Sequence, residues 1–169
     1  SLEASALIQE IGGEITFVAD LQARDLPTDR VDSYWPPGLA RFTRDWILAH
    51  ISGGRLSSAR ARIAGARDAK GAFQLSSLNG DLDFEDWTVD YLPPMPKAVK
   101  TRGRAKFNRK TMEVTIDEAQ ALDLRVTSGS VVFTGFDQFD QLADIDLVIE
   151  GPFNSALRLI DSEPLGFAK

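Results

Sequence analysis

Apolar and polar residues alternate along most of this chain, which is typical of strands in a sheet with one buried face. Between Arg55 and Ala66, small apolar residues alternate with serines and arginines, and Asp81 to Glu85 alternates acids with Leu82 and Phe84. We predict turns at 79–80, 108–111 and 127–130. The strands that we predict are 14–21, 55–66, 73–77, 82–91, 105–107, 112–116, 122–126, 131–133 and 143–150.

Helical spacing is clearest from Pro37 to Ser52, where apolar residues make one stripe. A proline at the first helical position is favourable, and Gly53-Gly54 supplies a stop. The pattern also predicts a short helix over 153–160, and a short helix or the tail of a preceding element over 2–11. The stripe is made by Leu39, Phe42, Trp46 and Ala49.

The phase of the alternation changes once inside a predicted strand. Trp87, Val89 and Tyr91 are out of phase with Leu82 and Phe84, which predicts a bulge or break near 85–86. Beyond it, the stretch 92–96 reads LPPMP, and its prolines cannot donate ladder hydrogen bonds. Two interpretations are open: a rigid crossing of the mouth of a curved sheet, or a loop that blunts a sheet edge.

Together these patterns predict a mainly β protein: a curved antiparallel sheet, forming an open groove, with one amphipathic helix and a short C-terminal helix. We expect one domain over 1–169. The chain begins Ser-Leu without an initiator methionine, and we expect it to be a fragment of a longer protein.

Composition narrows the function. The net charge of −6 argues against nucleic-acid partners, which need a basic surface, and against simple adhesion to anionic membranes. The chain has no cysteine, so it has no disulfide framework, zinc ribbon or thiol nucleophile. It holds neither a run of about 18 apolar residues nor a signal-peptide pattern.

Polar candidates for chemistry each have a simpler structural interpretation. His50 lacks a second histidine or a cysteine, and suits a helix C-terminus. The acids at 81, 83 and 85 follow Asn-Gly but lack a calcium-loop pattern, and a strand face paired with arginines is favoured. Ser128-Gly129-Ser130 indicates a turn and not a nucleophile elbow.

Two larger sets remain as alternatives. Four aspartates near the C-terminus could supply paired carboxylates for a glycosidase, although a solvated face is the default. Aromatic residues could stack on sugars, although a core role is favoured. The aspartates are Asp137, Asp140, Asp144 and Asp146, and the aromatic residues are Tyr34, Trp35, Trp46, Trp87 and Tyr91.

Four stretches carry a family resemblance. They are YWPPGLARFTRDWILAHISGGRLSSARARI (34–63), DLDFEDWTVDYLPPMPKAVKTRGRAKFN (81–108), LRVTSGSVVFTGFD (124–137) and ADIDLVIEGPFNSALRLIDSEPLGFA (143–168). In order and wording they resemble AsmA-like envelope proteins of the YhdP type, a family related to TamB. The resemblance covers the chain from about residue 34 onward, and its motifs are structural and not catalytic.

The resemblance implies a Gram-negative protein anchored in the inner membrane by an N-terminal helix that is outside this chain. It also implies a periplasmic body, a long curved sheet whose apolar inner surface carries phospholipid to the outer membrane. This segment would then be non-enzymatic, without metal or cofactor, and its partners would be phospholipid acyl chains. The alternative is a scaffolding or protein-interaction module of the envelope that binds no lipid.

We can name the residues that would line such a groove. An uncovered apolar sheet face can be met by acyl chains, at about 0.8 kcal/mol per buried methylene. Whether the helix at 37–52 fills the concave side decides whether lipid could enter. The candidates are Leu82, Phe84, Val114, Ile116, Leu122, Leu124, Val131, Phe133, Ile145, Leu147 and Ile149.

Overall fold

A computed structural model describes residues 1–35, 41–67, 71–136 and 142–167. The helical elements are η1, a 3-10 turn (Thr28–Arg30), α1 (Val31–Tyr34), α2 (Arg41–His50) and α3 (Phe153–Asp161). The strands are β1 (Leu2–Ile11), β2 (Glu14–Pro27), β3 (Ile51–Ser52), β4 (Arg55–Arg67), β5 (Phe73–Val89), β6 (Ala98–Asn108), β7 (Thr111–Ala121), β8 (Leu124–Thr134) and β9 (Leu142–Glu150).

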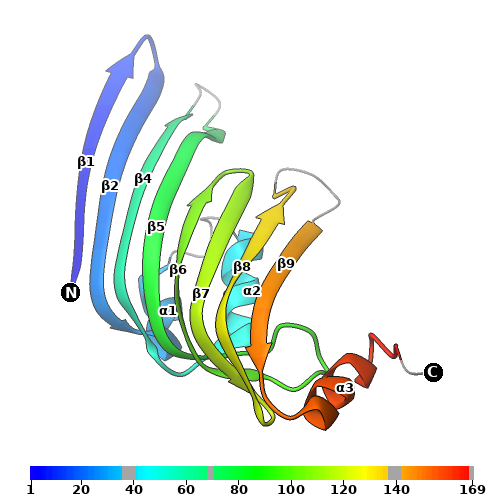
Figure 1. The fold of residues 1–169 in the computed structure, drawn as a ribbon. Helices are drawn as coiled ribbons and strands as arrows, with labels where there is room; N and C mark the ends of the chain where they lie inside the picture. Colours follow the sequence, from blue (N-terminus) through cyan, green and yellow to red (C-terminus); the bar gives the residue numbers. More distant parts are fainter. Residues whose placement is uncertain (36–40, 68–70, 137–141, 168–169) are drawn as a thin grey trace.

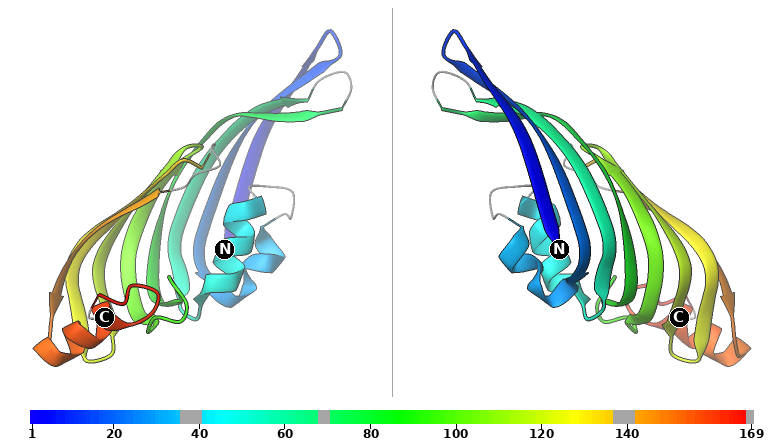
Figure 2. Two further views of the ribbon diagram at one scale, coloured as in Figure 1. Left: turned by 90° about the vertical axis from the view of Figure 1, so that its right-hand side faces the viewer. Right: turned by 90° about the vertical axis from the view of Figure 1, so that its left-hand side faces the viewer.

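The strands form one antiparallel sheet in the order β1-β2-β4-β5-β6-β7-β8-β9, with β3 paired to the end of β5. The sheet is curved and is not closed, so β1 and β9 form its two edges (Figure 1). Figure 2 shows α1 and α2 on the concave side, at the lower end of the sheet. The prediction of a mainly β, curved antiparallel sheet is confirmed.

Three predictions of local structure were wrong. Residues 2–11 are not helical but form β1, because their alternation continues through a Gly12-Gly13 turn into a ladder with β2. A segment rich in Ala, Leu, Gln and Glu has a high intrinsic helix propensity, but here the pairing with β2 overrides that preference. Asn79-Gly80 and 127–130 are not turns but lie inside β5 and β8.

Gly80 and Gly129 have a packing role in these strands. A Cβ at Gly80 would meet the ring of Phe107 from β6, and a Cβ at Gly129 would lie 2.5 Å from a methyl carbon of Leu147 from β9. Each glycine thus leaves room for a larger side chain on the next strand. The hairpin between β7 and β8 is instead made by Leu122 and Asp123, with Leu122 at φ 55°.

Other local predictions hold. The 108–111 turn joins β6 to β7, and the Asn108 side-chain oxygen accepts backbone hydrogen bonds from Lys110 (2.8 Å) and Thr111 (3.0 Å). The C-terminal helix is α3. The predicted helix over 37–52 is α2, which ends at His50, because Ile51–Ser52 pair with β5 as β3. Residues 36–40, including predicted helix positions 37–40, lie outside the described residues.

The predicted bulge at 85–86 is confirmed. The pairing of β5 with β6 shifts register between Phe84 and Trp87, and Asp86 has φ 58°. Phe84 and Trp87 therefore share one face, with their rings stacked 4.3 Å apart. Register irregularities or left-handed residues also occur near this level in the neighbouring strands, at Asp25, 56–58, 99–102, 116–119 and 126–128.

Most of the buried core lies at the lower end of the sheet, near and beneath these bulges, and Ala23, Ile63 and Ala105 are buried above them. The indole nitrogen of Trp87 donates a buried hydrogen bond of 2.6 Å to the Thr28 hydroxyl, which ties η1 to the sheet. The proline-rich segment crosses this end of the sheet between β5 and β6, and its Met95 is buried (Figure 1). Other core residues are Leu26, Val31, Phe84, Ala119, Ala121, Leu124 and Val126.

Candidate functional site

The face of the sheet that carries Leu82 is apolar from one edge to the other. We call it the inner face, because η1, α1 and α2 lie on its side. The strand register places apolar residues next to one another in rows that cross every long strand. One row, from β1 to β9, is Leu2, Ala23, Ala59, Leu82, Ala105, Val114, Val131 and Ile145.

The next row toward the hairpin tips is Ala4, Leu21, Ala61, Gly80, Phe107, Met112, Phe133 and Ala143. The next row toward the core is Leu26, Leu56, Phe84, Gly103, Ile116, Gly129 and Leu147. No residue in these three rows has a charged or hydrogen-bonding side chain. Exposing an uninterrupted apolar strip of this width to water is unfavourable in free energy.

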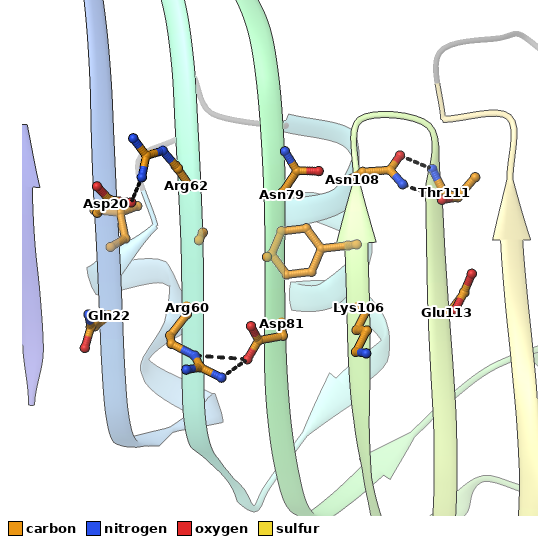
Figure 3. A pocket seen from close by; sticks show the side chains of 14 residues that line it. Asp20, Gln22, Arg60, Arg62, Asn79, Asp81, Lys106, Asn108, Thr111 and Glu113 are labelled. Carbon is orange, nitrogen blue, oxygen red and sulfur yellow. Dashed lines mark hydrogen bonds and ion pairs between the residues drawn. The ribbon is translucent and has the colours of Figure 1, made fainter.

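The opposite face of the sheet, which we call the outer face, is mainly charged and polar. The row aligned with the first inner row is Glu3, Gln22, Arg60, Asp81, Lys106, Glu113, Val132 and Asp144. Across neighbouring strands, Arg60 pairs with Asp81 at 3.1 Å and Arg62 pairs with Asp20 at 3.6 Å (Figure 3). These exposed pairs add little stability, about 0–1 kcal/mol each, but they make the outer face highly water-compatible.

The outer face holds an open depression of about 530 Å³, lined mainly by the charged and polar side chains of Figure 3. Asp81 lies beside Arg60 there, and Asp83 accepts a 2.6 Å hydrogen bond from Ser58. The predicted pairing of acid 81 with an arginine is confirmed. The described residues contain no group of three or more His, Asp or Glu side chains placed to hold a metal ion.

Glu85 shows the electrostatics of this face at the bulge. Its carboxylate accepts hydrogen bonds from the Arg55 guanidinium at 2.9 and 3.3 Å, and Asp25 lies 3.2 Å from the same group. The hydrogen bond from Arg55 is the main cause that lowers the pKa of Glu85. The two acids in turn raise the pKa of Arg55.

The structure brings most of the predicted groove residues together. Eight have half-exposed or exposed side chains on the inner face: Leu82, Val114, Ile116, Val131, Phe133, Ile145, Leu147 and Ile149. Phe84 and Leu124 are each only 3% exposed, so they belong to the core and not to an open surface. Leu122 does not lie in one of the strands but in the β7–β8 turn, where it is 45% exposed.

Sequence reasoning missed the part of this face that comes from the N-terminal strands. Leu2, Ala4, Ala6 and Ile8 lie in the segment predicted as a short helix or the tail of a preceding element, although their period of two indicates a strand. Leu21, Phe107 and Met112 also point to this face, and the same alternation would have found them.

The helices leave much of the inner face uncovered. Figure 2 shows α1 and α2 beside the lower part of the sheet only. On α2, Trp46 and Leu48 are 37% and 40% exposed, so these two apolar side chains are not buried against the strands. His50 ends α2, as expected, and its Nδ1 lies 2.9 Å from the Asp90 carbonyl oxygen. The described part of the helix, Arg41–His50, therefore does not fill the concave side.

The solvent-accessible surface area of the chain is consistent with an uncovered sheet face. The accessible surface area is 11148 Å², whereas a compact chain of 18.6 kDa is expected to expose about 8,200 Å². No large side chain of the described residues is completely buried. The extra area, about a third, is what a single curved layer predicts.

The other candidates are placed as follows. Asp144 and Asp146 lie on the outer face of β9, while Asp137 and Asp140 lie outside the described residues. Trp87 is buried in the core, in keeping with the structural interpretation. No described helix is long and apolar enough to cross a membrane. No protein-family model, curated protein or solved structure matches this chain.

Proposed function

We propose that the inner face binds phospholipid acyl chains, as one segment of a hydrophobic conduit between the two membranes of a Gram-negative envelope. The observation that carries the proposal is the set of three uncharged apolar rows, which the helices cover only at one end. The resemblance to AsmA-like proteins gives the biological setting, with periplasmic location and an anchor elsewhere in the protein.

The energetics suit a lipid that moves along the surface. An acyl chain of about 16 carbons gains roughly 0.8 kcal/mol per methylene removed from water, and it gains a similar amount inside a bilayer. Exchange between bilayer and protein is therefore nearly balanced. The apolar rows offer no hydrogen-bonding side chain that would hold a lipid at one point, and hydrophobic contact is non-directional, so sliding costs little.

Neighbouring residues on opposite faces give a matched test. A photo-crosslinking residue is placed at Leu82 or Val131 on the inner face, and at Asp83 or Ser130 on the outer face, in cells that make the full-length protein. Phe84 is unsuitable, because it is packed in the core. We expect phospholipid adducts, detected by mass spectrometry, at Leu82 and Val131 and not at their neighbours.

Absence of lipid at both inner positions, or equal lipid labelling on the two faces, would refute the proposal. Crosslinks from the inner positions to a protein would instead support the scaffolding alternative, in which another polypeptide covers the apolar rows. That alternative keeps one structural observation in its favour, which is that both edges of the sheet are open.

A further inference from the structure

The edge strand β9 has an unpaired side that the sheet leaves open. Among the described residues, β9 pairs with β8 and with no other strand, and all its side chains except Leu147 are exposed. An exposed strand edge carries free N–H and C=O groups that can pair with another strand. Leu142, Ile145 and Val148 are 70%, 59% and 54% exposed, so β9 exposes apolar side chains on both faces.

The charges on β9 show what kind of strand fits there. Within the sheet, outer-face acids have a cation on a neighbouring strand, as Asp20 has Arg62 and Asp117 has Arg104 at 3.6 Å. Asp144 and Asp146 differ, because the residues opposite them on β8 are Val132 and Ser130. No cation among the described residues pairs with either acid.

Glu150, the third acid on this side of β9, makes the contrast sharper. It lies opposite Arg125 of β8, and the two side chains are 3.4 Å apart. The strand β8 therefore pairs Glu150 with a cation and leaves Asp144 and Asp146 without one. Opposite charges facing each other across a ladder stabilise it, and like charges destabilise it.

We infer that β9 is a docking edge for an extended polypeptide strand in which basic residues alternate with apolar ones. Its basic side chains would face Asp144 and Asp146 on the outer face, and its apolar side chains would continue the rows through Ile145 and Leu147. The strand β6 already shows this pattern inside the sheet, with Arg104 and Lys106 outside and apolar residues inside.

A second copy of this chain does not fit the same edge. Its free strands are β1 and β9, and neither contains a lysine or arginine. Pairing two β9 strands would bring their own aspartates together, and pairing β9 with β1 would add Glu3, which is also on the outer face, and no cation. The partner is therefore a different strand. The helix α3 lies beyond the foot of β9 (Figure 1) and exposes Phe153 and Leu157, which extends the apolar contact.

Peptide binding to the purified chain tests this inference separately from lipid binding. The probe is a fluorescein-labelled nine-residue peptide of alternating Arg and Val, and the readout is fluorescence anisotropy. A block peptide of the same composition controls for charge. Two further peptides are N-methylated on every Val or on every Arg, so that each loses the amide donors of one edge only. We expect the alternating peptide to bind more tightly than the block peptide.

Variants of the protein locate the site. Asp144→Lys with Asp146→Lys should weaken binding at least tenfold, whereas Glu3→Lys with Glu10→Lys, which changes the net charge equally at the other edge, should change it little. One of the two N-methylated peptides should lose binding and the other should keep it. That comparison uses wild-type protein, so it tests whether the peptide pairs as a strand even where circular dichroism shows that a variant has not folded.

Several results would overturn the inference. They are no binding of the alternating peptide, equal binding of the block peptide, equal behaviour of the two N-methylated peptides, or equal effects of the two pairs of substitutions. Sedimentation showing a dimer of the chain that the β9 substitutions dissociate would also overturn it, since a second copy would then be the occupant.

Discussion

The hydrogen bond between Trp87 and Thr28 is the buried side-chain link between η1 and the sheet among the described residues, and a double-mutant cycle can measure it. Trp87→Phe removes the indole donor and keeps an aromatic ring over Phe84. Thr28→Val removes the hydroxyl acceptor and keeps the branched shape. Both groups are buried, Trp87 at 8% and Thr28 at 3% exposure, and their nitrogen and oxygen atoms are 2.6 Å apart.

The expected magnitudes follow from that burial. A buried polar group left without its partner costs about 1–3 kcal/mol, whereas removing both partners together can be nearly neutral. Each single substitution should therefore lower the free energy of unfolding by about 1–3 kcal/mol. The double variant should be more stable than the sum of the two losses predicts, by about 1 kcal/mol or more.

Urea unfolding followed by far-ultraviolet circular dichroism gives the four free energies. Circular dichroism is preferred to fluorescence, because Trp87→Phe removes one of three tryptophans. Losses that add within about 0.3–0.5 kcal/mol would mean that the two groups are independent. That result would refute the assignment of the hydrogen bond as the link that holds η1 against the sheet.

Three further changes test other parts of the structure. Thr101 is buried and its hydroxyl makes no hydrogen bond, so Thr101→Val should raise the free energy of unfolding by about 1 kcal/mol in urea titration; a loss of stability would contradict this. Because Arg55 lowers the pKa of Glu85, the stability that the pair contributes is present above the ordinary carboxyl pKa of about 4.3 and is lost as the pH falls through the lowered value. Arg55→Gln should therefore raise the pKa of Glu85 in a carboxyl NMR titration, and an unchanged value would contradict the assignment. Val131→Asp should abolish copurification of phospholipid, measured by mass spectrometry of extracted lipid, while Ser130→Asp on the outer face should leave it unchanged; equal lipid content in both variants would contradict an inner-face site.

The fold class and the two-faced character of the sheet could be predicted from the sequence, because alternation with a period of two is itself the physical cause of a two-faced sheet. The bulge at 85–86 could be predicted for the same reason. Trp87 and Phe84 are both large and apolar, and only an extra residue between them lets both face the core.

Turns were harder to predict, since the same residues serve two purposes. Asn79-Gly80 carries a strong turn signal, but in β5 the glycine makes room for Phe107 on the neighbouring strand. A single sequence does not show which strand will lie alongside, so steric demands of that kind are invisible before pairing is known. Leu122 was misplaced for a different reason: the turn between β7 and β8 contains no glycine, asparagine or proline, and Leu122 itself takes the left-handed conformation.

The extent of the candidate site could not be predicted, because it depends on where bulges on different strands coincide. Each bulge alone changes only one strand, but here irregularities in six strands lie close to one level of the sheet. Strands that bend together turn the whole sheet. Trp87, Ala119 and Val126 below the bend are buried, while Leu82, Val114 and Val131 above it stay half exposed. The extra residues let apolar side chains on both sides of the bend point to the inner face, so the apolar strip continues from the open rows to the core, where Thr101 opposite Trp87 brings in one buried hydroxyl. An apolar ligand on the inner face would therefore meet a closed apolar floor at one end of the sheet, and the bulges, more than any single pocket residue, set where that floor begins.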